Sequence, residues 1–131
     1  MAELLAYLKQ VVETQGSDMF IVAGGPVSVK RDGHLCPVSG EKVFPQETER
    51  LISGIYALAQ RPMEAFTRAG DDDFSFAVPG LARFRVNAYR ERGSLAAVVR
   101  VVAFDIPDWR ALHIPEQVMN LADVTQGMVL V

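Results

Sequence analysis

The feature that most constrains the fold is an alternation of apolar and polar residues over positions 82–89. Apolar side chains stand at every second position, with arginine, asparagine and tyrosine between them. Because successive side chains of a strand point to opposite faces, this pattern predicts a β-strand with one buried face. Glu91-Arg92-Gly93-Ser94 follows as a turn in which Gly93 can take a positive φ. The apolar, β-branched run 95–102 then returns, so we expect a β-hairpin over 81–102 whose second strand is covered on both faces.

This hairpin concentrates positive charge in an acidic chain. It holds five arginines and one glutamate, a net charge of +4, whereas the 131-residue chain carries −3 and has a pI of about 5.3. Such a local surface suits one anionic ligand, because a binder of nucleic acid or of an acidic membrane favours a whole basic face. Arg100 is the one charge in the returning strand; it lies at an edge, pairs with an acid, or faces a cleft that holds an anion. The five residues are Arg83, Arg85, Arg90, Arg92 and Arg100.

The rest of the chain supplies further helices and strands. Apolar spacing predicts helices over 2–15 and from Pro45 to about residue 59, and a short helix from Pro62 to Gly70. Short strands are predicted over 18–23, 26–30 and 34–38, and a longer strand follows the acidic loop 71–73. The order α-β-β-β-α-α-β-β-β predicts an α+β domain with a mostly antiparallel sheet and helices packed on one side.

Prolines separate residues 1–103 from the rest of the chain. The segment 104–131 reads as a partly extended linker, a short helix over about 116–122 and an apolar run, 126–131, that we expect to open a second domain. The sequence has no signal-peptide pattern and no apolar run approaching the roughly 20 residues of a membrane span. With a single cysteine, Cys36, the protein is expected to be cytoplasmic.

Four motifs carry a family resemblance. They are GSDMFIVAG at 16–24, VKRDG at 29–33, DFSF at 73–76 with PGLARFRVN at 79–87, and QGMVLV at 126–131. Together they resemble the N-terminal domain of the type IV pilus retraction ATPases, the PilT/PilU group of the secretion-ATPase superfamily. Phe20 stands where the retraction ATPases usually have a histidine, as in the PilU type, whereas the later hairpin resembles the PilT type. The subgroup therefore stays open.

The resemblance implies a fold and a site. Residues 1–103 would form a PAS-like domain, and 104–131 would lead into a RecA-like ATPase domain. Arg85 and Arg100 would be arginine fingers that contact the phosphates of ATP in the full-length protein, with Arg83 as a further contact to the phosphates or at the domain interface. Arg90 would contact a neighbouring domain or subunit. The motif GxxxxGK[ST] does not occur in the sequence, so no ATPase activity is expected from this chain alone.

The resemblance also implies cofactors and partners. ATP and Mg²⁺ would serve the full-length motor, whereas this chain alone would hold no cofactor. Its partners would be its own RecA-like domain, neighbouring subunits of a homohexamer and the inner-membrane platform of the pilus. Nucleic acid and direct membrane insertion are not expected, and the protein would lie in the cytoplasm, peripheral to the inner membrane.

Two other functions fit parts of the sequence. A nucleic-acid-binding module would stack bases on Phe84 and Tyr89, but Phe84 lies on the strand face opposite the arginines. A PAS-like ligand sensor would need polar groups in the core, and none stands out. The remaining titratable residues favour structural roles over a metal site or a nucleophile, with acids 71–73 expected to be solvated; these residues are His34, His113, Cys36 and Asp71–Asp73.

Overall fold

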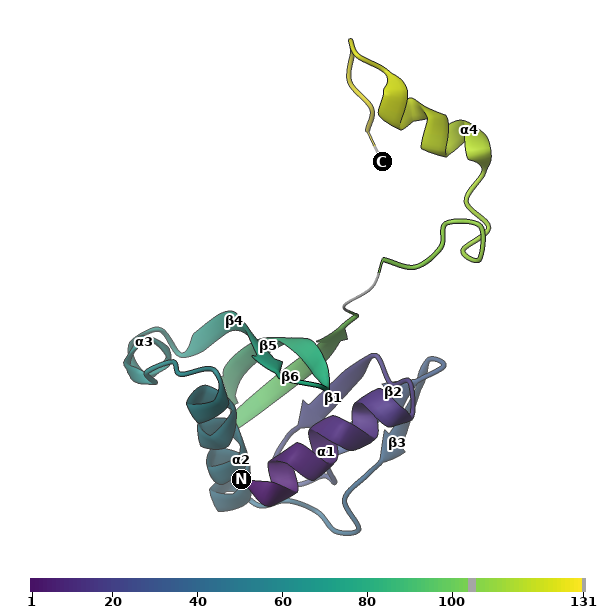
Figure 1. Ribbon diagram of the computed structural model, residues 1–131. Coiled ribbons are helices and arrows are strands. Elements are labelled where there is room, and N and C mark those ends of the chain that lie inside the picture. Colours follow the sequence, from purple (N-terminus) through teal and green to yellow (C-terminus); the bar gives the residue numbers. More distant parts are fainter. Residues whose placement is uncertain (104–105, 131) are drawn as a thin grey trace.

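The computed structural model describes residues 1–103 and 106–130 (Figure 1). The first nine elements follow the predicted order of helices and strands. In the described residues they are α1 (Ala2–Glu13), β1 (Asp18–Ile21), β2 (Ser28–Arg31), β3 (His34–Pro37), α2 (Pro45–Leu58), α3 (Glu64–Ala69), β4 (Asp71–Val78), β5 (Ala82–Glu91), β6 (Ser94–Val102), α4 (Glu116–Met119) and the 3₁₀ helix η1 (Asn120–Asp123).

The strands form one six-stranded sheet in the order β3-β2-β1-β6-β5-β4, and every described pair of neighbours is antiparallel. Helices α1 and α2 lie on the same side of this sheet (Figure 1). The prediction of an α+β domain with helices on one side of a mostly antiparallel sheet is therefore confirmed. Within the described residues no helix covers the opposite face of the sheet, and the polar positions of β5 lie on that face (Figure 1).

The core lies between the sheet and the helices. Along β5, Ala82, Phe84, Val86 and Ala88 are buried, while the residues between them are half-buried or exposed. The helices contribute apolar stripes, and the Phe76 and Phe84 rings stack with centroids 5.2 Å apart. Side chains that are fully buried include Leu4, Leu8, Met19, Ile21, Ile52, Ile55, Tyr56, Phe66 and Phe84.

Two hairpin turns have the same backbone form. Arg92 and Gly93 have φ values of 48° and 83°, and Asp32 and Gly33 have φ values of 49° and 81°. Two successive residues with positive φ define a type I′ turn, whose twist matches that of the flanking antiparallel strands. The predicted turns between β2 and β3 and between β5 and β6 are confirmed, and the second carries an arginine where asparagine or aspartate is usual.

The prediction for β6 was wrong in one respect. On the outer face Ala96 is buried, but Val98 is half-buried and Val102 is 36% exposed, so this face of the strand is covered only at its start. The sequence suggests two covered faces because small and β-branched apolar residues fill both. Helices lie on one side of the sheet, and the outer positions of β6 line its open face.

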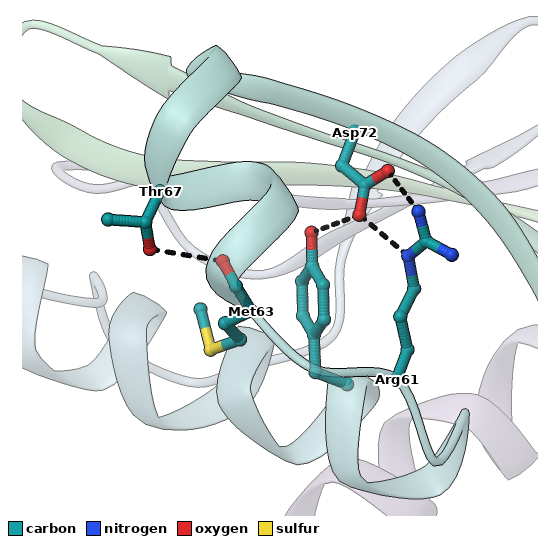
Figure 2. Close-up of polar contacts among 5 residues, drawn as sticks. Arg61, Met63, Thr67 and Asp72 are labelled. Atoms are coloured by element: carbon teal, nitrogen blue, oxygen red, sulfur yellow. Dashed lines mark hydrogen bonds and ion pairs between the residues drawn. The ribbon is translucent and has the colours of Figure 1, made fainter.

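The prediction of three solvated acids was wrong for Asp72, whereas Asp71 and Asp73 are exposed. The three aspartates are the first residues of β4, and the carboxylate of Asp72 is buried, with a side chain only 9% exposed. The Tyr56 hydroxyl donates to Asp72 Oδ2 at 3.0 Å, and Arg61 donates from Nε and Nη2 at 2.8 Å each (Figure 2). Asp72 is therefore not a solvated loop acid, because it joins the start of β4 to the end of α2.

The described residues 106–130 lie apart from the sheet (Figure 1). They contain no buried side chain, and only Trp109 and Ile114 are half-buried. The predicted helix appears as α4 and η1, but 126–130 form no strand, because no second strand in the described residues pairs with them. Phe104, Asp105 and Val131, which belong to the predicted linker and strand, lie outside the described residues. None of the helices within the described residues is long and apolar enough to cross a membrane.

Candidate functional site

Arg85 and Arg100 lie side by side on the open face of the sheet. They are direct partners in the register of β5 and β6, and their side chains are 64% and 66% exposed. The strand alternation explains this position, because Phe84, Val86 and Val99 on the other face are fully buried. The type I′ turn fixes the register of the hairpin and so sets the two arginines opposite each other.

The two arginines line one hollow. Its volume is about 260 Å³, and its walls come from β1, β4, β5 and β6. The lining side chains combine two guanidinium groups with two carboxylates, one amide and one apolar group. They are Asp18, Asp73, Arg85, Asn87, Val98 and Arg100.

Arg85 is paired with an exposed acid from β4. Its Nε and Nη2 donate to the two carboxylate oxygens of Asp73 at 3.0 and 2.9 Å. These hydrogen bonds hold the pKa of Asp73 below its ordinary value. The Asp73 side chain is 48% exposed, so water competes for both partners, and pairs of this kind contribute little to stability.

Arg100 is paired with a buried acid from β1. Its Nε donates to Asp18 Oδ1 at 2.8 Å, and the Ser17 hydroxyl donates to Asp18 Oδ2 at the same distance. The Asp18 side chain is only 8% exposed. Burial by itself raises the pKa of Asp18, but the hydrogen bonds from Arg100 and Ser17 outweigh burial and hold that pKa below its ordinary value. Lys30, opposite Asp18 on β2, favours the charged carboxylate as well.

The structure separates the other predicted arginines from this hollow. Arg83 lies on the same face as Arg85 but is paired in register with Ala77 and Val102, and it does not line the hollow. Arg90 lies over the ring of Phe66, with its guanidinium carbon 5.4 Å from the ring centroid. Of the three residues expected at a phosphate site, Arg85 and Arg100 are therefore brought together and Arg83 is not.

Sequence reasoning missed the acids of the hollow. An acidic partner for Arg100 was one of the expected alternatives, but the partner is 82 residues away along the chain, and its identity depends on the pairing of β1 with β6. Asp73 was expected to be solvated rather than paired. The sequence does contain a signal for this pair. Asp73 lies in the strand that precedes β5, so in an antiparallel pairing of the two strands it can contact an arginine on the same face.

The nucleic-acid alternative loses one of its two stacking residues. Phe84 is fully buried beneath the sheet, so no base can stack on it, and Tyr89 is half-buried.

In the described residues, no three His, Cys, Asp or Glu side chains are grouped so that they could hold a metal ion. His34 is exposed, and Cys36 is half-buried.

Comparison with known proteins agrees with the fold and with the motifs. The chain is 33% identical over 123 residues to the type IV pilus ATPase PilU of Pseudomonas aeruginosa, a match over 94% of this chain and 32% of PilU. It is 34% identical over 130 residues to the type IV pilus retraction ATPase PilT of the same organism, a match over 98% of this chain and 36% of PilT. A twitching motility protein of Neisseria gonorrhoeae is 27% identical over 120 residues, which cover 92% of this chain and 31% of that protein.

Solved structures extend the agreement to three dimensions. The pilus retraction motor PilT, crystallised with bound ADP, superposes on 92% of this chain with a TM-score of 0.74 and 31% identity, and the match covers 35% of PilT. The DotB ATPase of Legionella pneumophila, at 21% identity and a TM-score of 0.60, shares the fold over 92% of this chain and 33% of DotB.

No family model matches the sequence. The chain spans about one third of the length of the relatives it matches. The identity extends over nearly the whole chain, and the sheet with its helices on one side matches the N-terminal domain of PilT. The chain therefore belongs to the PilT/PilU family of type IV pilus ATPases and corresponds to the N-terminal domain of such a protein.

Proposed function

We propose that this domain is part of an ATP-driven motor that retracts type IV pili, and that Arg85 and Arg100 contact the phosphates of ATP. In this proposal a RecA-like domain holds the nucleotide with Mg²⁺, and the open face of the sheet closes over it. The observation that carries the proposal is the placement of the two arginines opposite each other on β5 and β6, where both line one hollow.

The chemistry of the arginines supports a phosphate contact. A guanidinium group is permanently charged, and its planar fork can donate two hydrogen bonds to phosphate oxygens. Charge that builds on a transferring phosphoryl group is offset by such a residue, which accelerates the reaction by about 10³ to 10⁵ where it has been measured. Both side chains are about two-thirds exposed, so an approaching domain can reach them.

The proposed assembly rests on the same family membership. We propose a homohexamer in which this domain contacts its own RecA-like domain and a neighbouring subunit. The motor would work in the cytoplasm against the platform proteins of the pilus at the inner membrane. The linker, short helix and first strand of a RecA-like domain predicted for residues 104–131 belong to this proposal, and the exposed apolar residues of 106–130 are available for packing against that domain.

Kinetics of the full-length ATPase that carries this domain test the site. We expect Arg85→Ala and Arg100→Ala each to lower kcat by roughly 10² or more, because each removes a charge that stabilises the transition state. KM for ATP should change less, since the RecA-like domain holds the nucleotide. Arg68→Ala is the matched control, because Arg68 is an exposed arginine of α3, away from the hollow. Wild-type kcat in both hairpin variants would remove the site assignment.

A further inference from the structure

The two arginines of the hollow differ in how many donors they have already used. Arg85 donates from both Nε and Nη2 to Asp73, which occupies one side of its fork. Arg100 donates from Nε alone to Asp18, and in the part of the chain that the structure describes its two terminal nitrogens form no hydrogen bond with protein. Arg100 can therefore accept a phosphate without giving up its acid, whereas a phosphate that approaches Arg85 along the occupied side has to compete with Asp73.

The two acids also differ in how firmly each is held to its arginine. Asp18 is buried, with 8% of its side chain exposed, and it is held from a second direction by Ser17. Removal of Arg100 from it would leave a buried carboxylate with one hydrogen bond fewer, which is costly. Asp73 is 48% exposed, so water can replace Arg85 as its partner at little cost.

We propose that Asp18 is a positioning residue that keeps Arg100 aligned while its terminal nitrogens take a phosphate, and that Asp73 is an exchangeable acid that the phosphate replaces on Arg85. The inference rests on the proposed function, because it presupposes that the hollow receives a phosphate group. It assigns opposite roles to two aspartates of the same hollow. Before exchange the two arginines and two aspartates are formally neutral together, and release of Asp73 frees the Arg85 guanidinium to pair with the anion instead.

Two substitutions of equal charge separate these roles. Asp73→Asn and Asp18→Asn each raise the net charge of the chain by one, and both residues line the hollow. If charge alone governed binding, the two variants would bind an anion more tightly by similar factors. If the roles differ as proposed, Asp73→Asn releases Arg85 in advance, while Asp18→Asn takes away the acid that aligns Arg100.

The probe is inorganic tripolyphosphate, added to this chain and followed by NMR of the arginine Nε–H groups. We expect Asp73→Asn to tighten binding roughly two- to fivefold, the range expected for release of an exposed ion pair. Asp18→Asn should bind no more tightly than the wild-type chain, because loss of alignment offsets the charge it gains. Equal tightening in both variants would overturn the inference and leave the phosphate site standing. Absence of any binding to the wild-type chain would also overturn the inference, because neither arginine would then take a phosphate in this domain. The phosphate site of the full-length motor is tested separately by the kinetics of Arg85→Ala and Arg100→Ala.

A measurement on the wild-type chain keeps the test valid if Asp18→Asn fails to fold. At high tripolyphosphate, the Nε–H signal of Arg100 should stay close to its free position, because its bond to Asp18 persists. The signal of Arg85 should move, and the carboxyl carbon of Asp73 should titrate with a pKa closer to its ordinary value. If the Arg100 signal moves as far as that of Arg85, or if Asp73 keeps its lowered pKa, the assigned roles are wrong.

Discussion

The buried contact between Tyr56 and Asp72 allows a quantitative prediction for Tyr56→Phe. The Tyr56 ring is 1% exposed and packs against Phe74 with centroids 4.7 Å apart, so phenylalanine keeps the packing and loses only the hydroxyl. That hydroxyl donates at 3.0 Å to a carboxylate (Figure 2). Hydrogen bonds to charged groups contribute about 1.5–3 kcal/mol. Asp72 keeps two hydrogen bonds from Arg61, so we expect the free energy of unfolding to fall by about 1–2 kcal/mol.

Urea denaturation at pH 7 measures this loss. With an m-value of about 2 kcal/mol/M, the midpoint should fall by about 0.5–1 M without a change in m. Tyr7→Phe is the matched control, because the Tyr7 hydroxyl also donates to a carboxylate at 3.0 Å, that of Glu3, but at the surface. The control should lie within about 0.5 kcal/mol of the wild type.

The pH dependence provides a second check on the same contact. Hydrogen bonds from Arg61 and Tyr56 hold the pKa of Asp72 below its ordinary value of 3.8. A carboxylate whose pKa is lowered on folding stabilises the protein above the unfolded pKa, and this stability is lost as the pH falls through the folded pKa. The cost of Tyr56→Phe should therefore be constant from pH 7 down to about 4.5 and shrink below that. An unchanged midpoint at pH 7, or a cost that is the same at pH 2, would refute the reasoning.

Three further predictions concern packing and turns. Gly16→Ala should destabilise the chain by about 1–3 kcal/mol in urea denaturation, because a Cβ there would meet the buried side chain of Val29 and lie 2.9 Å from Cγ2 of Val11. Gly40→Ala, where a Cβ would meet nothing within 4 Å, should be close to neutral, and equal effects at the two sites would contradict the packing argument. Phe84→Ala should cost about 3–5 kcal/mol, since the ring is fully buried against Phe76; a loss below 1 kcal/mol would mean that the core collapses around the site. Arg92→Asn should raise the melting temperature with a gain of about 0.5 kcal/mol, because asparagine tolerates the φ of 48° better; a lower melting temperature would show that Arg92 makes contacts that matter more.

The sequence was sufficient for the features that depend on neighbours along the chain. The alternation in β5 places Phe84 inward and Arg85 outward, and Arg92-Gly93 marks the turn that brings Arg100 opposite Arg85. The two central residues of the candidate site are therefore paired by local rules. The PAS-like description, the domain boundary at residue 103 and the roles of the arginines stay predictions.

The features that the sequence did not reveal depend on tertiary contacts. Asp18 meets Arg100 across 82 residues, and no local pattern distinguishes this acid from the others. The burial of the Tyr56 ring on α2 also depends on a tertiary contact, because its hydroxyl finds a partner only in Asp72 on β4. A run of three aspartates usually signals a solvated loop, and here two of the three side chains have arginine partners that only the folded sheet supplies.

The pairing of β1 with β6 has a consequence for how the protein folds. In the described sheet, β1–β3 come from the first forty residues and β4–β6 from residues 71–102, and β1 with β6 is the one pairing between the two groups. Closure of so long a chain loop costs entropy before it yields contacts, so we expect this pairing to form after the local hairpins. The hollow takes Asp18 from one group of strands and its remaining walls from the other. An intermediate with a finished β5–β6 hairpin would therefore carry both arginines but no complete site, and anion binding would report completed folding of the whole domain.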